Sequence, residues 1–148
     1  MILKKIRNFI NRLRGEVSTD WLISRGMKVG KNFARQTNVV LDPHHCHLIE
    51  IGDNVTLAPQ VYILCHDAST KMFLGKTKTA PVKIGNNVFV GARTLIMPGV
   101  SIGDNVVIGA GSLVVKDIPS NSLAFGSPAK VVNTLDDYLE KMKIKNKW

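Results

Sequence analysis

The chain has 148 residues, of which 45% are hydrophobic and 21% charged, and its formal net charge is +9. This length fits one domain with an apolar core, and no apolar run is long enough to cross a bilayer. The basic charge favours anionic partners. We expect no nucleic-acid partner, because no binding motif occurs and the few aromatic residues do not alternate with the basic ones.

Residues 2–14 are expected to form an amphipathic helix that Gly15 ends. Two compatible roles stay open, namely covering an open edge of a β structure and attaching the protein to anionic lipid. Basic residues interrupt the stretch, so we do not expect it to be a secretory signal. We expect a cytoplasmic protein, with peripheral contact at the inner face of the membrane as the open alternative. The apolar stripe is Ile2, Leu3, Ile6, Phe9, Ile10 and Leu13, and the basic side is Lys4, Lys5, Arg7, Arg12 and Arg14.

After a lead-in over residues 16–28, the sequence adopts a six-residue spacing that begins at Val29. The stretch from Asp42 to Gly52, DPHHCHLIEIG, breaks this register and predicts a local loop. It contains three histidines and a cysteine, a combination that can bind zinc. We expect no metal, because the sequence shows no second Cys/His group, and the role of the histidines is left open. These residues are His44, His45, Cys46 and His47.

A protruding loop is predicted at about residues 65–81. Ile63 is in register with the hexads before it, and the next residue in first place is Ile84. The spacing between these two residues is three residues longer than a whole number of hexads. The chain must therefore leave the repeat between them. Long loops on a rigid scaffold often hold functional residues.

The stretch from Ile84 to Pro119 consists of six consecutive hexads, IGNNVF, VGARTL, IMPGVS, IGDNVV, IGAGSL and VVKDIP. First places hold Ile or Val, and fifth places hold small or β-branched residues. A helix would spread these positions over several faces, and frequent Gly and Asn argue against a long interior strand. A coil of short strands with tight corners fits, with first and fifth side chains pointing inward, because Gly and Asn accept left-handed backbone angles.

After Pro119, the segment SNSLAFGSPAKVV is expected to complete the end of the coil, and residues 134–148 are expected to form a C-terminal helix. Asp136 and Asp137 fall near the start of that helix and lysines near its end, which suits the helix dipole. The cysteines Cys46 and Cys65 give no disulfide framework and are expected to be free, buried thiols.

The hexads, the segment IGDNVTLAPQVYILCHDAST from Ile51, and GSPAKVV together resemble the hexapeptide-repeat acyltransferases over roughly residues 27–133. The resemblance implies an all-β solenoid, a left-handed parallel β-helix with N-terminal and C-terminal helices and one protruding loop. We divide the chain into an N-terminal helix and lead-in (1–28), the acyltransferase domain (29–133) and a C-terminal helix (134–148).

Within that family the chain looks most like the galactoside, maltose and surface-polysaccharide O-acetyltransferases. The resemblance implies acetyl-CoA as the donor and a homotrimer as the assembly. The implied acceptor is a sugar hydroxyl, on a surface-polysaccharide or lipid-linked glycan precursor. Acyl transfer needs a base for the hydroxyl proton, and histidine suits this role near neutral pH.

His66 is the candidate base, because it stands where the repeat gives way to the loop, as the catalytic histidine does in the family. The chain reads CHDAST there, whereas the galactoside and maltose enzymes carry a Gly-His-Pro step. Asp67 is expected to orient the imidazole, to hydrogen-bond the acceptor or to cap the loop. Asn38 and Asp42 resemble acceptor-binding residues of the family. Cys65 invites a covalent acyl-enzyme, but the resemblance implies direct transfer.

The coenzyme is expected to lie in a groove between neighbouring subunits. Phe89 takes the place of an aromatic residue near the acyl group in the galactoside enzyme. The small residues either leave room for the pantetheine arm of the coenzyme or are required only by the corners of the coil. Two lysines match family positions whose basic residues contact the coenzyme phosphates. These residues are Gly91, Ala92, Ala110, Lys116 and Lys130.

Three other functions stay open at this point. One is N-acetylation of an amino sugar by the same base, and another is a γ-class carbonic anhydrase-like metalloprotein, although its pair of histidines five apart is absent. The third is a binding or scaffold module that kept the fold and lost the chemistry, against which His66, Lys116 and Lys130 argue.

Overall fold

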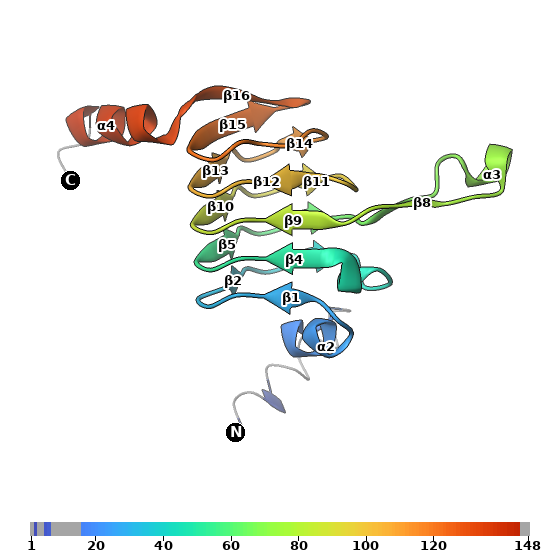
Figure 1. The fold of residues 1–148 in the computed structure, drawn as a ribbon. Coiled ribbons are helices and arrows are strands. Elements are labelled where there is room, and N and C mark those ends of the chain that lie inside the picture. Colours follow the sequence, from blue (N-terminus) through green and yellow to red (C-terminus); the bar gives the residue numbers. More distant parts are fainter. Residues whose placement is uncertain (1, 3–4, 7–15, 146–148) are drawn as a thin grey trace.

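The computed structural model describes residues 2, 5–6 and 16–145, and short strands in three mainly parallel sheets form its body (Figure 1). The first sheet contains β1 (Lys28–Val29), β4 (Ile49–Ile51), β9 (Val82–Ile84) and β12 (Ser101–Ile102). The second contains β2 (Ala34–Arg35), β5 (Val55–Leu57), β10 (Val88–Val90), β13 (Val106–Ile108), β15 (Ser122–Gly126) and β16 (Ala129–Thr134). The third contains β3 (Val40–Leu41), β6 (Tyr62–Ile63), β11 (Leu95–Ile96) and β14 (Leu113–Val114).

The chain visits the three sheets in a fixed order. β1, β2 and β3 lie in the first, second and third sheets, and β4, β5 and β6 repeat this sequence one level further along. We call each such passage a rung and the whole arrangement the stack. Strands on neighbouring rungs pair in parallel, whereas β16 runs antiparallel to its neighbour β15. A residue's position within a rung therefore fixes which residues lie directly above and below it.

The hexad register correctly predicts the interior of the stack. Every first-place and fifth-place side chain from Ile84 to Ile118 is at most 4% exposed. These side chains pack in columns, because parallel pairing puts equivalent places above one another, as in Ile63, Ile96 and Val114. The polar members Thr94 and Ser112 reach the carbonyl oxygen of Gly109 with their hydroxyl groups, so burial leaves neither unpaired.

Asparagine ladders hold one corner of the stack. Asn54, Asn87 and Asn105 all adopt positive φ angles of 56°, which asparagine tolerates better than most residues. The Asn54 amide donates to Asn87 and the Asn87 amide to Asn105, both at 3.0 Å. The recurrent IGDN and IGNN segments thus supply both the corner conformation and the bonds between rungs.

Helices lie at both ends of the stack (Figure 1). At the first rung, α2 (Thr19–Ser24) buries Leu22, and the short 3₁₀ helix η1 (Cys46–Leu48) packs beside it. At the last, α4 (Leu135–Lys145) follows β16 with Asp136 and Asp137 in its first turn. The predicted helix over residues 2–14 lies largely outside the described residues. None of the described helices combines the length and hydropathy that crossing a bilayer requires.

The predicted protruding loop is present as a hairpin that leaves the stack after β6 (Figure 1). Its strands β7 (His66–Asp67) and β8 (Lys78–Thr79) pair antiparallel, and the one-turn helix α3 (Lys71–Leu74) lies at its tip. We call this segment the hairpin. His66 occupies its first position, where the chain departs from the stack.

Candidate active site

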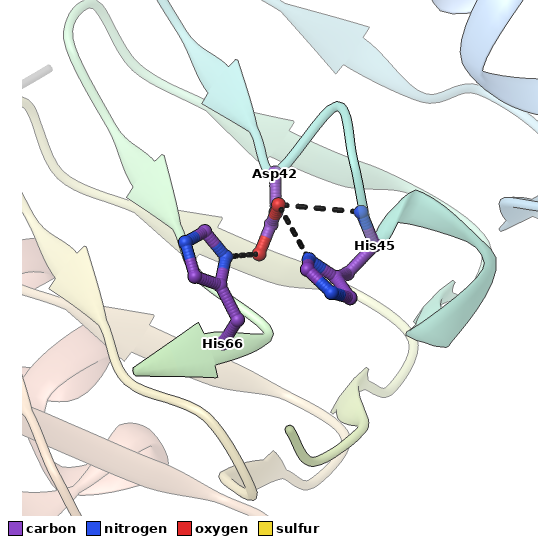
Figure 2. A group of neighbouring side chains, drawn as sticks. All are labelled: Asp42, His45 and His66. Carbon is purple, nitrogen blue, oxygen red and sulfur yellow. Dashed lines mark hydrogen bonds and ion pairs between the residues drawn. The ribbon is translucent and has the colours of Figure 1, made fainter. Parts of the chain in front are cut away.

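His66 and Asp42 meet at the corner between the third and first sheets. Asp42 follows β3 on the first rung, and His66 stands three residues after β6 on the second. The His66 Nδ1 atom lies 2.6 Å from the Asp42 Oδ2 atom, and Figure 2 shows the imidazole facing that carboxylate. This contact fixes the ring and favours the tautomer that carries its proton on Nδ1. The Nε2 atom is then left with a lone pair.

Asp42 is buried, with 1% of its surface exposed, and the backbone around it holds its carboxylate in place. The Cys65 backbone N–H donates to Oδ2 at 2.8 Å, while the Asp42 N–H donates to the carbonyl of Ile63 at 3.0 Å. Burial by itself would raise the pKa of Asp42. Hydrogen bonds from His66 and the Cys65 N–H, together with the nearby imidazoles, outweigh burial, and the pKa of Asp42 is lowered. Asp42 is thus an anion that orients His66.

His45 approaches the same carboxylate from the other side (Figure 2). Its backbone N–H lies 3.3 Å and its Nδ1 atom 3.4 Å from Asp42 Oδ1. The imidazole rings of His45 and His66 are 4.8 Å apart between centroids, at an interplanar angle of 33°. About a third of each histidine side chain is exposed, 29% for His45 and 34% for His66. Both rings therefore meet solvent while Asp42 does not.

The Cys65 thiol is poorly suited to nucleophilic attack. Both cysteines are free and buried, as predicted. Burial, joined by the negative charge of Asp42, raises the pKa of the Cys65 thiol to about 12. Since the thiolate is the reactive form, the neighbour of His66 is held as an inert thiol.

The other predicted acceptor-binding residues are Asp67, which follows His66 in the hairpin, and Asn38, which lies at the opposite corner of the third sheet. Asp67 accepts a hydrogen bond from the Ser69 N–H at 2.8 Å, the loop-capping arrangement that was one of its predicted roles. That bond and the charges of Lys78 and His66 lower the pKa of Asp67. Asn38 adopts a positive φ of 58° at the corner between the second and third sheets. Their roles in acceptor binding stay predictions.

A cavity of about 820 Å³ runs along the outer face of the third sheet. Asn38 lines it at one corner, and Pro43 and Leu64, neighbours in sequence of Asp42 and His66, line it at the other. Its floor is largely apolar, with Val40, Tyr62 and Leu95 in register across the sheet. His66 itself is not in the lining. The cavity therefore ends beside Asp42 and His66 rather than containing them.

The predicted coenzyme residues fall on two separate parts of the stack. Lys116 follows β14 at the same corner as His66, two rungs away, which corresponds to roughly 10 Å of strand spacing. Phe89, Ala92 and Ala110 lie in or just after strands of the second sheet, and Lys130 lies in β16. A single chain does not bring these two sets together. Their contacts with coenzyme stay predictions.

Gly91 has a structural explanation of its own. A Cβ atom at this position would come within 2.4 Å of the Ala110 backbone nitrogen on the next rung. The close approach of two corners therefore requires glycine there, which is the corner requirement that was one of its two predicted roles.

Sequence reasoning named His66 and Asp42 as candidates but did not pair them, and it left His45 without a role. The signal was present in the spacing Asp42-x-x-His45 directly after a strand. The contact with His66 could not be predicted from this spacing, because the interrupted register hides the fact that Asp42 and His66 occupy one corner on adjacent rungs.

Comparisons with known proteins agree with the six-residue repeat. Residues 81–116 match the family model "Bacterial transferase hexapeptide (six repeats)". The chain is 38% identical to Protein CapG of Staphylococcus aureus over 146 residues, which cover 95% of this chain and 83% of that protein. The chain belongs to the hexapeptide-repeat transferases.

Two solved structures of this kind align with the stack. One is a maltose O-acetyltransferase from Clostridium difficile 630, with 47% identity and a TM-score of 0.65 over 74% of this chain. The other is a galactoside acetyltransferase in complex with coenzyme A, with 38% identity and a TM-score of 0.69 over 78% of this chain. The chain spans 59% and 58% of these two proteins, so it is shorter than either.

Proposed function

We propose that this protein is an acetyltransferase that moves the acetyl group of acetyl-CoA to a sugar hydroxyl, with His66 as the general base. The observation that carries the proposal is the 2.6 Å contact between the buried Asp42 carboxylate and His66 Nδ1. It leaves the partly exposed Nε2 edge free to accept a proton. The two acetyltransferase structures that resemble the stack support acetyl transfer, and one of them holds coenzyme A.

In the proposed reaction, the acceptor hydroxyl loses its proton to His66 Nε2 while its oxygen attacks the thioester carbonyl carbon. A carbon–oxygen bond forms, the carbon–sulfur bond breaks, and the coenzyme leaves as a thiol after His66 returns the proton. Asp42 stabilises the imidazolium that exists between these steps, because its charge lies against Nδ1. No covalent acyl-enzyme is involved, which agrees with the high pKa of the Cys65 thiol.

We further propose that the stack is a left-handed parallel β-helix that works as a homotrimer. The fixed order of the three sheets and the family match support the β-helix. The trimer is supported by the separation of the predicted coenzyme residues, because Phe89 and Ala110 lie away from the corner that holds His66 and Lys116. Copies placed side by side would bring one set to face the other and complete a groove for coenzyme.

The acceptor is proposed to lie in the cavity on the third sheet, entering between Pro43 and Leu64 toward His66. Its apolar floor and polar rim suit a sugar ring, which presents both C–H faces and hydroxyl groups. A surface-polysaccharide or lipid-linked glycan precursor is the proposed substrate class. An amino group on the sugar would react by the same route, so N-acetylation is the second outcome that an acceptor panel distinguishes.

Contact with an anionic membrane is proposed for residues 2–14, which contain several basic residues and no acidic one. Deleting residues 1–14 should abolish sedimentation with anionic vesicles if this segment makes the contact. Unchanged sedimentation would contradict it.

The test of the function is coenzyme A thiol release with acetyl-CoA and a panel of sugars and nucleotide sugars. Replacing His66→Ala should lower turnover about 10²–10⁴-fold without weakening acetyl-CoA binding. Two matched variants should retain turnover within a few-fold, namely His47→Ala on η1 and Cys65→Ala beside the base. Full activity in the His66 variant, or loss in the Cys65 variant with its fold intact, would contradict the mechanism.

A further inference from the structure

The site brings together three groups with the chemistry of a transition-metal site. Asp42, His45 and His66 each offer one ligand atom, and these atoms all lie within 4.8 Å of one another. Two imidazoles and one carboxylate are a ligand set that Zn²⁺ and related ions prefer. In sequence, His66 lies far from the other two residues, and the pairing of adjacent rungs is what unites them (Figure 2).

We propose that this cluster reversibly binds a divalent transition-metal ion such as Zn²⁺, and that the bound ion switches the base off. The ligands would be the Asp42 carboxylate and the Nδ1 atoms of His45 and His66. Metal binding does not depend on the function proposed above, whereas the inhibitory effect rests on it.

The arrangement of the ligands favours binding with little rearrangement. The two Nδ1 atoms already face one carboxylate, at 2.6 Å from Oδ2 and 3.4 Å from Oδ1. Zinc bonds to nitrogen and oxygen are about 2.0–2.2 Å long, so modest rotations of the two rings would admit an ion. Both rings are partly exposed, so an ion that replaces the Nδ1 proton can reach them from solvent, while the Cys65 N–H holds the carboxylate. Solvent can supply the remaining ligand.

The inhibitory effect follows from the tautomers of imidazole. As a base, His66 keeps its proton on Nδ1, donates it to Asp42, and uses the lone pair on Nε2. An ion bound to Nδ1 uses the lone pair of Nδ1 and displaces the proton from that atom. The single proton of the neutral ring must then reside on Nε2. The ring then has no site to accept the acceptor's proton. Metal occupancy and base catalysis are therefore mutually exclusive.

His45 and His47 form a matched pair of test positions. His45 contacts Asp42 Oδ1, whereas His66 contacts Oδ2, so replacing His45 removes a metal ligand and leaves the contact between Asp42 and His66 in place. His47 is exposed, and its ring centroid lies 6.3 Å from that of His45, outside the cluster. Glutamine in place of His45 keeps an N–H donor for Oδ1 but removes the ring nitrogen.

The experiment is a titration of the full-length protein with Co²⁺, followed by its visible absorption, and a parallel titration of activity with Zn²⁺. Wild type and His47→Gln should each bind about one Co²⁺ per chain, and His45→Gln should bind at least about ten-fold more weakly, since one of three ligands is lost. Zn²⁺ should inhibit wild type and His47→Gln, reversibly on addition of a chelator. His45→Gln should resist inhibition by Zn²⁺ when its rate is compared with its own rate before metal is added.

Three outcomes separate this inference from the proposed function. Absence of Co²⁺ bands in wild type, or equal binding by His45→Gln and His47→Gln, would overturn the metal site. Co²⁺ binding without inhibition of an active enzyme would overturn the switch. Co²⁺ binding as expected in a protein that shows no acetyl transfer before metal is added would leave the site standing and count against the proposed function.

Discussion

The stack buries its apolar side chains, whereas the tip of the hairpin exposes them. In the stack, the first-place and fifth-place side chains point inward and are almost fully buried. At the tip of the hairpin, three consecutive apolar side chains are exposed, at 88% for Met72, 81% for Phe73 and 70% for Leu74. The strands of the hairpin pair only with each other among the described residues. His66, the proposed base, lies where the two regions join, so the buried stack positions it and a segment with few contacts begins beside it.

The largest expected difference between the two regions is the cost of removing an apolar side chain. Ile96→Ala in the stack should lower the free energy of unfolding by about 2–5 kcal/mol, because a fully buried side chain leaves a cavity. Phe73→Ala at the hairpin tip should change it by no more than about 0.5 kcal/mol. Urea denaturation at one fixed protein concentration measures both.

Phe73→Ala also tests whether the apolar side chains of the hairpin tip are buried in an assembly of several copies. A large loss of stability in Phe73→Ala would show that the hairpin tip is buried in the assembled protein. Size-exclusion chromatography with light scattering on the same samples would reveal whether a second copy buries it.

Replacing a glycine by alanine should lower the stability of the protein in both regions, but for different reasons. Gly91→Ala in the stack should cost about 1–3 kcal/mol, because its Cβ would lie 2.4 Å from the Ala110 backbone nitrogen. Gly75→Ala in the hairpin meets no atom within 4 Å but must hold a φ of +67°, which costs about 1 kcal/mol. Thermal unfolding of the two variants compares the effects. A larger shift for Gly75 than for Gly91 would contradict the tight corner.

The hexad pattern predicted the stack well because its cause is local. A side chain such as Ile96 or Val100 points inward as a result of its place within six residues, and the asparagine corners repeat the same way. Counting residues between Ile63 and Ile84 was enough to predict the hairpin. The contact between Asp42 and His66 was harder to predict. These residues meet only through the pairing of adjacent rungs, across a register break that contains η1.

Acidic pH should distinguish the two aspartates whose pKa values are lowered, one in each region. For Asp42, buried in the stack, hydrogen bonds from His66 and the Cys65 N–H outweigh burial. For Asp67, in the hairpin, the main cause is the Ser69 N–H. A carboxyl group whose pKa is lower in the folded state contributes stability above its unfolded pKa, about 3.9, and loses it as pH falls through the folded value.

Wild type should therefore lose stability below about pH 4 in part through Asp42. Asp42→Asn should already be less stable at pH 7 and should fall less steeply between pH 5 and pH 2. Asp67→Asn should follow the wild-type curve closely, because its carboxylate is accessible to water and its bond to Ser69 organises only the hairpin. Urea denaturation across this pH range gives the three slopes. Parallel slopes for wild type and Asp42→Asn would mean that the charge of Asp42 does not stabilise the corner on which His66 depends.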